Sequence, residues 1–270
     1  MPNAKEATEK VAHRILLLGD TGTGKSTQLL TLPGKTFAYL FDSNALLSIR
    51  GHDVDYEEFL PDQLNLSVKS LSKDKGGDRT TNHANLMYSA WEKDFNERME
   101  SGAFDQYDNI GFDSATTFLD LIMDRILTIN GRAGQWPQQD DYGPQMVAFT
   151  NVIRTLTSLG KTLIVTGHLE VRQAEGSAKM LRQPMMTGRL RTKIPLLFSD
   201  IFITECTNDG KGNISHTIQT VPDRITSTVR TSIRGIEPVE DVTIDWSKEV
   251  KGKQGIGLLL EMEKAGKLGK

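Results

Sequence analysis

Residues 19–26 read Gly19-Asp20-Thr21-Gly22-Thr23-Gly24-Lys25-Ser26, which matches the pattern G-x-x-x-x-G-K-[ST] in full. The apolar run from Arg14 to Leu18 precedes it, as is typical of a central strand buried on both faces of a parallel sheet. A short helix is expected from about Lys25 to Leu32, because Pro33-Gly34 stops it. A glycine-rich turn between a buried strand and a helix predicts an α/β fold with a phosphate-binding loop.

The residue types in this loop suit the binding of a nucleoside triphosphate. Glycines let the backbone wrap tightly and turn its N–H groups toward phosphates, and the following helix directs its N-terminal dipole at the same anions. We expect Lys25 to contact the β- and γ-phosphates and the Ser26 hydroxyl to bind Mg²⁺. The predicted nucleotide-binding residues are Gly19, Asp20, Thr21, Gly22, Thr23, Gly24, Lys25, Ser26 and Thr27.

Strand patterns alternate with helical patterns along the rest of the chain. Strands are predicted at 36–41, 64–71, 109–112 and 162–166, and helices at 83–100, 116–130 and about 149–159. Loops are predicted at 53–62, 72–81, 131–143 and 168–187, and a β-hairpin at 196–205 and 214–221. This order predicts a mostly parallel sheet with helices on both faces and an antiparallel hairpin at one edge.

The composition is that of an ordinary globular protein. The chain has 270 residues, of which 37% are hydrophobic and 25% charged. A formal net charge of −3 excludes a uniformly basic nucleic-acid coat, so an anionic partner requires a local basic patch. The single cysteine, Cys206, excludes an intrachain disulfide and fits a reducing cytosol; we expect it to be buried in a strand. Neither a signal peptide nor a membrane-spanning run is visible, which predicts no membrane partner and a cytoplasmic location.

A second motif, Asn109-Ile110-Gly111-Phe112-Asp113-Ser114, predicts a buried strand that ends in an aspartate. This is the Walker B pattern, in which the carboxylate holds Mg²⁺ through its water shell beside the serine of the phosphate-binding loop. The predicted metal-binding residues are therefore Ser26 and Asp113. Asp113 and Ser114 also precede a helix and are good N-caps, and the two roles can coexist.

A competing pattern, Asp108-Asn109-Ile110-Gly111, matches the D-x-x-G of GTPases. It fixes only two positions, and the guanine-reading pattern Asn-Lys-x-Asp occurs nowhere in the chain; Ser72-Lys73-Asp74-Lys75 does not match it. The sequence therefore favours ATP over GTP.

Several of these segments resemble a known family. Phe112-Asp113-Ser114 resembles the RecA-like recombinases rather than helicases that carry an Asp-Glu pair. Phe41-Asp42-Ser43-Asn44-Ala45-Leu46 resembles the end of the second strand of that family. Thr187-Gly188-Arg189 and the apolar run 196–203 are similar to the segment after its second DNA-binding loop. The short helix closed by Leu32-Pro33-Gly34 resembles the phage-encoded, Sak-type single-strand annealing proteins, often described as AAA-family ATPases.

The resemblance covers about residues 14–235. It implies a RecA-like P-loop NTPase core at 13–247, with ATP and Mg²⁺ as ligands. A flexible arm is expected at 1–12, and a Lys/Gly-rich, poorly packed tail at 248–270. It further implies a ring or filament with nucleotide at the subunit borders, and single-stranded DNA annealing or recombination in the cytoplasm of a bacterial host.

The resemblance assigns catalytic roles to Lys25, Asp113, His168 and Asn44. Leu163-Ile164-Val165-Thr166-Gly167-His168 resembles a later strand of the family, which ends in a polar residue that senses the γ-phosphate; His168 can alternatively hydrogen-bond as a strand cap. Asn44 occupies the position at which the family has a glutamate that activates the attacking water. An amide cannot accept this proton, so either hydrolysis is slow or another carboxylate substitutes. The candidate substitutes are Glu57, Glu58 and Glu170.

Basic residues gather between 171 and 193, where the family places a loop that contacts single-stranded DNA. They are Arg172, Lys179, Arg182, Arg189, Arg191 and Lys193, and all but Lys193 are assigned to DNA binding. Such side chains can follow a phosphate backbone without reading its sequence, although this loop lacks aromatic residues for base stacking. The alternatives are a solvated surface or contact with the nucleotide of a neighbouring subunit.

Arg224 and Arg230 are candidates to reach the γ-phosphate of a neighbouring subunit, as basic residues do in RecA-like oligomers. Trp136, Asp140 and Asp141 lie in a segment that resembles the first DNA loop of the family, where two acids oppose close phosphate contact.

The function predicted from the sequence is slow hydrolysis of Mg-ATP coupled to the binding and annealing of single-stranded DNA. Two alternatives stay open: a nucleotide-gated DNA-binding or assembly protein with negligible turnover, and a motor ATPase of the helicase or packaging type.

Overall fold

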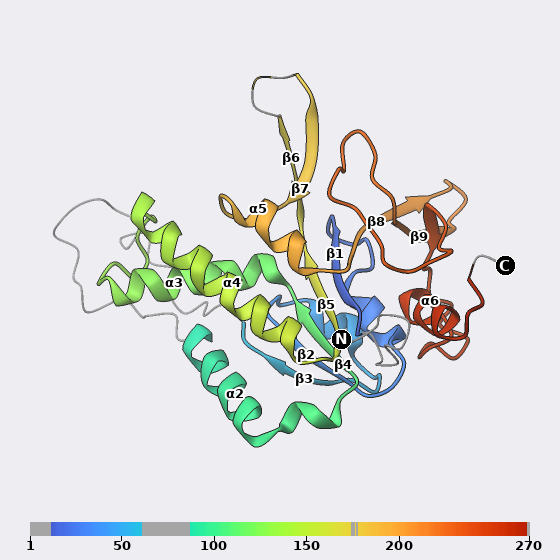
Figure 1. The fold of residues 1–270 in the computed structure, drawn as a ribbon, viewed down its shortest axis with the longest axis horizontal. Helices are drawn as coiled ribbons and strands as arrows, with labels where there is room; N and C mark the ends of the chain where they lie inside the picture. The colour runs from blue at the N-terminus through green and yellow to red at the C-terminus, as the bar shows by residue number, and fades with distance from the viewer. Residues whose placement is uncertain (1–11, 61–86, 174–175, 177, 269–270) are drawn as a thin grey trace, which may run out of the picture.

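The computed structural model describes residues 12–60, 87–173, 176 and 178–268, and Figure 1 shows their arrangement. The main sheet has eight strands in the order β10-β9-β8-β1-β5-β4-β2-β3. Their bounds are β1 Arg14–Gly19, β2 Thr36–Leu40, β3 Asp55–Glu58, β4 Asn109–Asp113, β5 Thr162–Gly167, β8 Asp200–Asn208, β9 Ile214–Gln219 and β10 Val239–Asp241. A second, two-stranded sheet pairs β6 (Leu169–Gln173) with β7 (Met180–Pro184).

The α-helices are α1 Ala45–Ile49, α2 Met87–Ser101, α3 Ala115–Ile129, α4 Tyr142–Ser158, α5 Leu190–Lys193 and α6 Gly255–Lys264. The short 3₁₀ helices among the described residues are η2 Ser26–Thr31, η5 Ala103–Gln106, η6 Gln139–Asp141 and η7 Ile194–Leu197. Within the described part of the chain, no helix has the length and apolar character needed to cross a membrane.

The centre of the main sheet is parallel. β1 pairs in parallel with both β5 and β8, and β4 pairs in parallel with both β5 and β2. β9 and β10 add antiparallel pairs at the edge beyond β8. The predicted α/β core, with a mostly parallel sheet, helices on both faces and an antiparallel edge hairpin, is confirmed.

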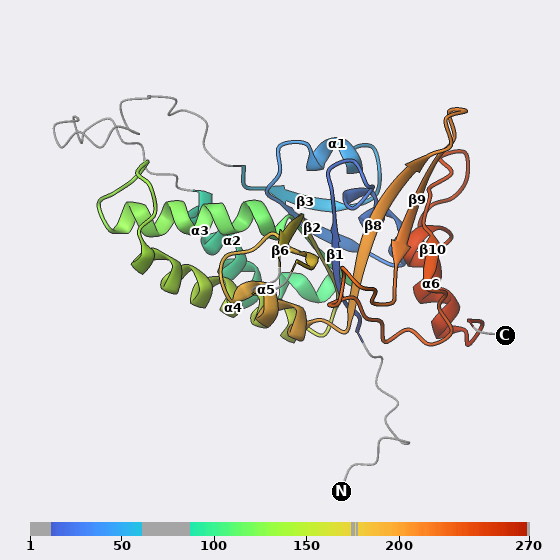
Figure 2. The same ribbon diagram turned by 90° about the horizontal axis from the view of Figure 1, so that it is seen from above.

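Apolar side chains of β1 alternate between two cores, one on each face of the sheet. Leu16 and Leu18 belong to the core shared with α2, α3 and α4, whereas Ile15 and Leu17 belong to the core shared with η2, α1 and α6. Figure 2 shows these two groups of helices on different sides of the strands. This burial on both faces explains why β1 reads as a continuous apolar run.

Two predicted loops contain strands. Residues 55–58 of the predicted loop 53–62 form β3, a short edge strand that pairs with β2 and leaves most of its polar side chains exposed. The predicted loop 168–187 contains the antiparallel pair β6 and β7, which extends away from the main sheet in Figure 1. β3 is largely polar, and β6 and β7 mix apolar with polar residues, so none of these three strands has the continuous apolar pattern that marks a buried strand. The predictions for 64–71 and 72–81 lie outside the described residues.

The expectation that the tail 248–270 packs poorly is wrong for α6. Ile256, Leu259 and Leu260 are buried against η2 and join the core on that face of the sheet. The prediction followed the many lysines and glycines of this segment and overlooked the short apolar stripe between them, which has helical spacing. Most of the predicted arm 1–12 lies outside the described residues.

Cys206 is exposed rather than buried. It lies in the second half of β8, where the strand runs beyond the core and its last four residues face solvent.

Candidate nucleotide-binding site

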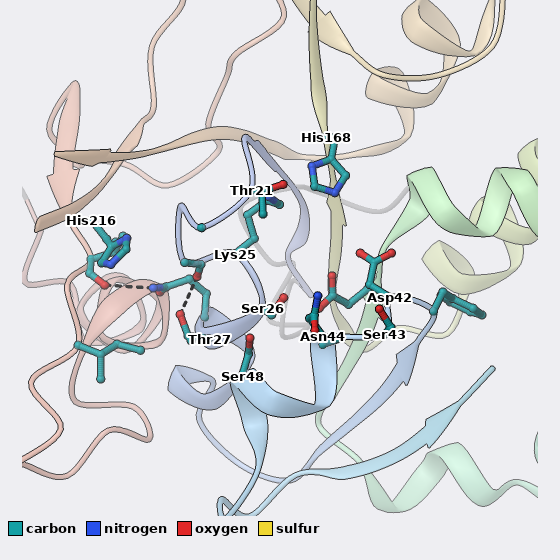
Figure 3. A pocket seen from close by; sticks show the side chains of 18 of the residues that line it. Thr21, Lys25, Ser26, Thr27, Asp42, Ser43, Asn44, Ser48, His168 and His216 are labelled. Carbon is teal, nitrogen blue, oxygen red and sulfur yellow. Dashed lines mark hydrogen bonds between the residues drawn. The ribbon is translucent and has the colours of Figure 1, made fainter. Parts of the chain in front are cut away.

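The carboxyl ends of the central strands meet at one cavity of about 800 Å³. The register sets Leu18 beside Gly167 and Leu40 beside Asp113, so the residues that follow β1, β2, β4 and β5 converge there. Parallel α/β sheets generally bind ligands at this edge. Figure 3 shows Asp42, Asn44 and His168 on one side of Lys25 and His216 on the other.

The phosphate-binding loop forms the middle of the cavity. Thr21, Gly22, Gly24, Lys25, Ser26 and Thr27 line it. Gly22 and Gly24 have φ values of 79° and 84°, a backbone region that side chains with a Cβ rarely adopt. The side chain of Thr23 helps to fix the conformation of the loop. Its hydroxyl donates to the Asp20 carbonyl at 2.8 Å and lies 2.6 Å from the Thr204 hydroxyl.

Lys25 is folded onto its own loop. Its Nζ atom donates to the carbonyls of Gly19 at 3.0 Å and Asp20 at 2.7 Å, and the residue is only 8% exposed. Burial lowers the pKa of Lys25 below its ordinary value, although the charges of Asp113, Asp42 and Asp20 act in the opposite direction. A triphosphate would give this desolvated ammonium group stronger anionic partners than two carbonyls.

Asp113 is fully buried at the end of β4. Its Oδ1 atom accepts a hydrogen bond from the Thr166 hydroxyl, and its Oδ2 atom is buried without a hydrogen-bond partner. Burial raises the pKa of Asp113 above its ordinary value, against the opposing effect of hydrogen bonds from Ser26 and Thr166. A buried carboxylate oxygen without a partner is costly in isolation and fits a cation that approaches from the cavity.

These residues fit Mg²⁺. The Ser26 hydroxyl and the Asp113 carboxylate are hard oxygen ligands, and both residues line the cavity. Within the described residues, no group of three or more His, Cys, Asp or Glu side chains could bind a metal ion alone. Mg²⁺ in nucleotide sites is commonly held by one or two protein ligands together with substrate phosphates and water.

Asp42 is a cavity residue that the sequence analysis did not select. It follows β2 directly and lines the cavity with Asn44, and its Oδ1 atom accepts a hydrogen bond from the Thr117 hydroxyl. The side chain is therefore oriented by α3. Its position after a strand at the binding edge of the sheet is a signal that could have identified it.

The three glutamates proposed as substitutes for the missing base do not line the cavity. Glu57 pairs with Arg98 at 2.9 Å, and Glu170 pairs with both Arg172 and Arg191 at 3.0 Å. Glu58 lies on the edge strand β3. Asp42 is thus better placed than any of them.

His168 lies where the sequence predicts it, directly after β5 and on the cavity wall. Its backbone N–H donates to the Thr116 hydroxyl at 3.0 Å, so α3 holds this residue as well as Asp42. Asp108, by contrast, precedes β4 at the opposite end from Asp113, which separates the D-x-x-G pattern from the cavity.

The opposite end of the cavity is formed by β9 and by the segment after β10. Its lining residues are Ile214, His216, Val242, Thr243, Ile244 and Trp246. The sequence did not predict these residues. They lie far from the phosphate-binding loop in the chain, and no local motif marks them as neighbours of that loop.

A family model described as an AAA domain matches residues 12–229. The chain belongs to this AAA domain family. The match spans the phosphate-binding loop, Asp113 and His168, and it supports nucleotide binding at the cavity. No curated protein shows significant similarity in sequence to the chain. Among solved structures, a KaiC-like protein from the hyperthermophilic archaeon Pyrococcus horikoshii is similar at 11% identity, with 77% of each chain covered and a TM-score of 0.36.

In this AAA domain, several of the basic residues assigned to DNA are already paired. Arg182 lies 2.7 Å from Glu205, and Arg191 pairs with Glu170 and donates to the Met186 carbonyl at 2.8 Å. Arg172 also pairs with Glu170, but its side chain is half exposed. Arg189 and Lys179 are exposed. Ion pairs within the chain therefore use some of the basic side chains of this segment, and it exposes less positive charge than its sequence indicates.

The two arginines predicted to act on a neighbouring subunit differ in their contacts within the chain. Arg230 donates through Nη2 to the carbonyls of Pro195, at 2.8 Å, and Phe198. Arg224 is exposed. Because the Arg230 guanidinium is engaged within the chain, Arg224 is the better candidate of the two.

In the segment 131–143, which contains Trp136 and Asp140, hydrogen bonds to Asp141 stabilise the local structure. This residue is 2% exposed and accepts hydrogen bonds from Arg132 and from Asn130, the latter at 3.1 Å. Its charge is therefore satisfied internally, whereas Trp136 is 73% exposed.

Proposed function

We propose that this AAA domain binds Mg-ATP and hydrolyses it slowly, and that hydrolysis is coupled to the binding of single-stranded DNA. The observation that carries the proposal is the unpartnered, buried Oδ2 atom of Asp113, beside Ser26 and Lys25 in one cavity. A buried carboxylate, a buried ammonium group and a glycine-rich loop between a strand and a helix suit a metal-bound triphosphate.

Each residue has a distinct task in this proposal. Lys25 leaves the Gly19 and Asp20 carbonyls to bind the β- and γ-phosphates. Ser26 and Asp113 would hold Mg²⁺, which would supply positive charge to offset that of the phosphates. Asp42 accepts a proton from water as the water oxygen bonds to the γ-phosphorus. The bond to the β–γ bridging oxygen breaks, and ADP and phosphate are formed. His168 contacts the γ-phosphate from the end of β5.

Slow turnover is expected from the side chains at the end of β2. Asn44 cannot act as a base, and Asp42 is one methylene shorter than the glutamate that the RecA-like family uses for this step. The approach of water is therefore less well organised than a longer carboxylate would make it.

The DNA-coupled part of the proposal is supported by the hairpin β6–β7 and the turn after it. Arg172, Lys179 and Arg189 are exposed on this unit, which adjoins the cavity because β6 begins directly after His168. Occupancy of the γ-phosphate site can thus alter the base of the hairpin. We also propose a ring or filament in which Arg224 reaches a neighbouring nucleotide, and a role in DNA annealing or recombination in a phage-infected bacterial cytoplasm.

ATP hydrolysis with and without single-stranded DNA tests this function, with Lys25→Ala as the control. We expect slow phosphate release that rises with DNA and falls to background in Lys25→Ala. Turnover that is indifferent to DNA would overturn the coupling and favour a motor or another ATPase.

A second function, a nucleotide-gated binder with negligible turnover, is favoured by Asn44. In that case ATP would shift the protein between two assemblies through its different affinity for each. Binding of ATP without phosphate release, together with ATP-dependent sedimentation or DNA binding, would identify it.

A further inference from the structure

The cavity extends past the phosphate-binding loop to an end that no step of the proposed hydrolysis uses. His216 on β9 and Val242, Ile244 and Trp246 after β10 line this end. Figure 3 places His216 on the far side of Lys25 from Asp42 and His168. We call these four residues the far wall.

The two ends differ in charge. Asp42 and Asp113 lie at the first end, whereas the far wall contains no carboxylate and combines aliphatic, imidazole and indole groups. A nucleotide has the same asymmetry, with a charged triphosphate at one end and a flat aromatic base at the other. With Mg²⁺ and the γ-phosphate at the acidic end, the ribose and base must extend toward the far wall.

The far wall is fixed rigidly to the phosphate-binding loop. The Gln28 side chain on η2 donates to the Val242 carbonyl at 3.0 Å, and the Val242 N–H donates to the His216 carbonyl at 2.8 Å. The His216 N–H donates to the Thr243 hydroxyl at 2.8 Å. These bonds set the distance between the wall and the loop before any ligand binds.

The His216 ring lies directly against the loop. A Cβ added to Gly24 would meet its Nδ1 atom at 3.0 Å, and that nitrogen is buried without a hydrogen-bond partner. The Trp246 side chain is available for a ligand, because the residue is 57% exposed. Its ring centroid lies 5.5 Å from that of His52. An imidazole ring that lines the cavity and an exposed indole face beside the phosphate-binding loop are groups expected of a nucleoside subsite.

We infer that the far wall is a nucleoside subsite, in which Trp246 stacks on a purine base and His216 hydrogen-bonds the nucleoside. The inference rests on the proposed binding of a triphosphate by the loop. Stacking on an aromatic side chain tolerates every base but favours the larger ring system, so ATP and GTP should bind more tightly than CTP and UTP.

Calorimetric titration with ADP and with inorganic tripolyphosphate, both in Mg²⁺, tests the inference. Tripolyphosphate occupies the loop but has no base. We expect Trp246→Ala and His216→Ala to weaken ADP binding on the order of tenfold and to leave tripolyphosphate binding unchanged. Trp246→Phe should restore most of the ADP affinity, because a phenyl ring still stacks. Tyr56→Ala, which removes an exposed aromatic side chain on β3, is the matched control.

The outcomes separate this inference from the proposed function. Equal loss of both ligands in the far-wall variants, or no loss of either, overturns the nucleoside subsite while the triphosphate site stands. Wild-type protein that binds inorganic pyrophosphate, which has the two phosphates of ADP and no base, as tightly as ADP overturns it too, without any variant. Wild-type protein that binds neither ligand overturns the proposed function and the subsite together.

Discussion

Turnover in the proposed site depends on two side chains that follow β2. Asp42 is oriented by the Thr117 hydroxyl and lies in the cavity with Asp113, while Asn44 presents an amide in the same cavity. A carboxylate and an amide of similar size differ in charge and in the ability to accept a proton, so substitutions at these two positions test which side chain acts as the base.

Asp42→Asn should lower kcat by about 10²- to 10⁴-fold with little change in KM, because it removes the group that accepts the proton of the attacking water. Asn44→Glu should raise kcat by restoring a longer carboxylate. Steady-state phosphate release measures both. Glu57→Gln is the control, since Glu57 pairs with Arg98 away from the cavity. An Asp42→Asn variant with wild-type kcat would show that Asp42 is not the base.

Among the elements, α6 supports the helix that follows the phosphate-binding loop. Side chains of η2 satisfy two N–H groups in the first turn of α6. Ile256 N–H donates to Gln28 Oε1, and Gly257 N–H donates to Thr31 Oγ1, both at 3.0 Å. Helix N-termini need such acceptors, so α6 and η2 form one unit.

Gly257→Ala should destabilise the protein by about 2–4 kcal/mol, because the added Cβ would lie 1.7 Å from the Thr31 carbonyl oxygen and must displace backbone. Urea unfolding measures this change. The matched control is Gly143→Ala in α4, where an added Cβ meets nothing within 4 Å, and its expected effect is neutral or slightly stabilising. Equal stability of the two variants would contradict the docking of α6 on η2.

The hairpin β6–β7 and the turn after it carry the proposed DNA contacts, and their arginines are not equivalent. Arg189→Ala should weaken binding of single-stranded DNA and reduce the slope of log K against log salt by about 0.7, as expected for the loss of one phosphate contact. Fluorescence anisotropy at several salt concentrations measures the slope. Arg154→Ala, an exposed arginine on α4, should leave it unchanged. A slope unaltered in Arg189→Ala would remove Arg189 from the interface.

On the scale of the whole molecule, His13 joins segments that are far apart in the chain. Its Nδ1 atom lies 3.2 Å from Asp200 at the start of β8, and its Nε2 atom lies 2.9 Å from Glu263 in α6. Burial acts to lower the pKa of His13, but the hydrogen bonds and charges of Asp200 and Glu263 outweigh it and raise this pKa above 6.5. The imidazolium, with a proton on each nitrogen, is the form that bonds both carboxylates.

Because the pKa of His13 is raised by folding, its contribution to stability is full below the unfolded value of 6.5 and is lost as pH rises through the folded value. Denaturant unfolding of wild type and His13→Gln between pH 5.5 and 8.5 should therefore show a wild-type advantage that shrinks as pH rises. An advantage that grows with pH would contradict the assignment.

At lower pH, protonation of Asp200, the partner of His13, determines where this interaction stops contributing to stability. Burial acts to raise the pKa of Asp200, but hydrogen bonds from His13, Ser199 and Ser232 outweigh it and hold this pKa below 3.8. The stability that Asp200 contributes is therefore present above pH 3.8 and is lost as the pH falls through its folded pKa.

The sequence by itself determined the parts of this protein that consecutive residues encode. The glycines, Lys25 and Ser26 define the phosphate-binding loop, and the apolar runs before Gly19 and Asp113 define two central strands, because burial on both faces of a sheet requires continuous apolar segments. The parallel core and the β8–β9 hairpin were predictable from the same local patterns.

The tertiary structure alone decided which distant side chains share the cavity. Asp42 lines the cavity, whereas Glu57, Glu58 and Glu170 do not. Arg182 and Arg191 form ion pairs with glutamates within the chain. His216 and Trp246, from the edge of the sheet and the segment after it, line the cavity beside the phosphate-binding loop. These outcomes depend on register, helix docking and charge pairing between segments far apart in the chain. Local periodicity reports how one segment is buried, but not which other segment covers it.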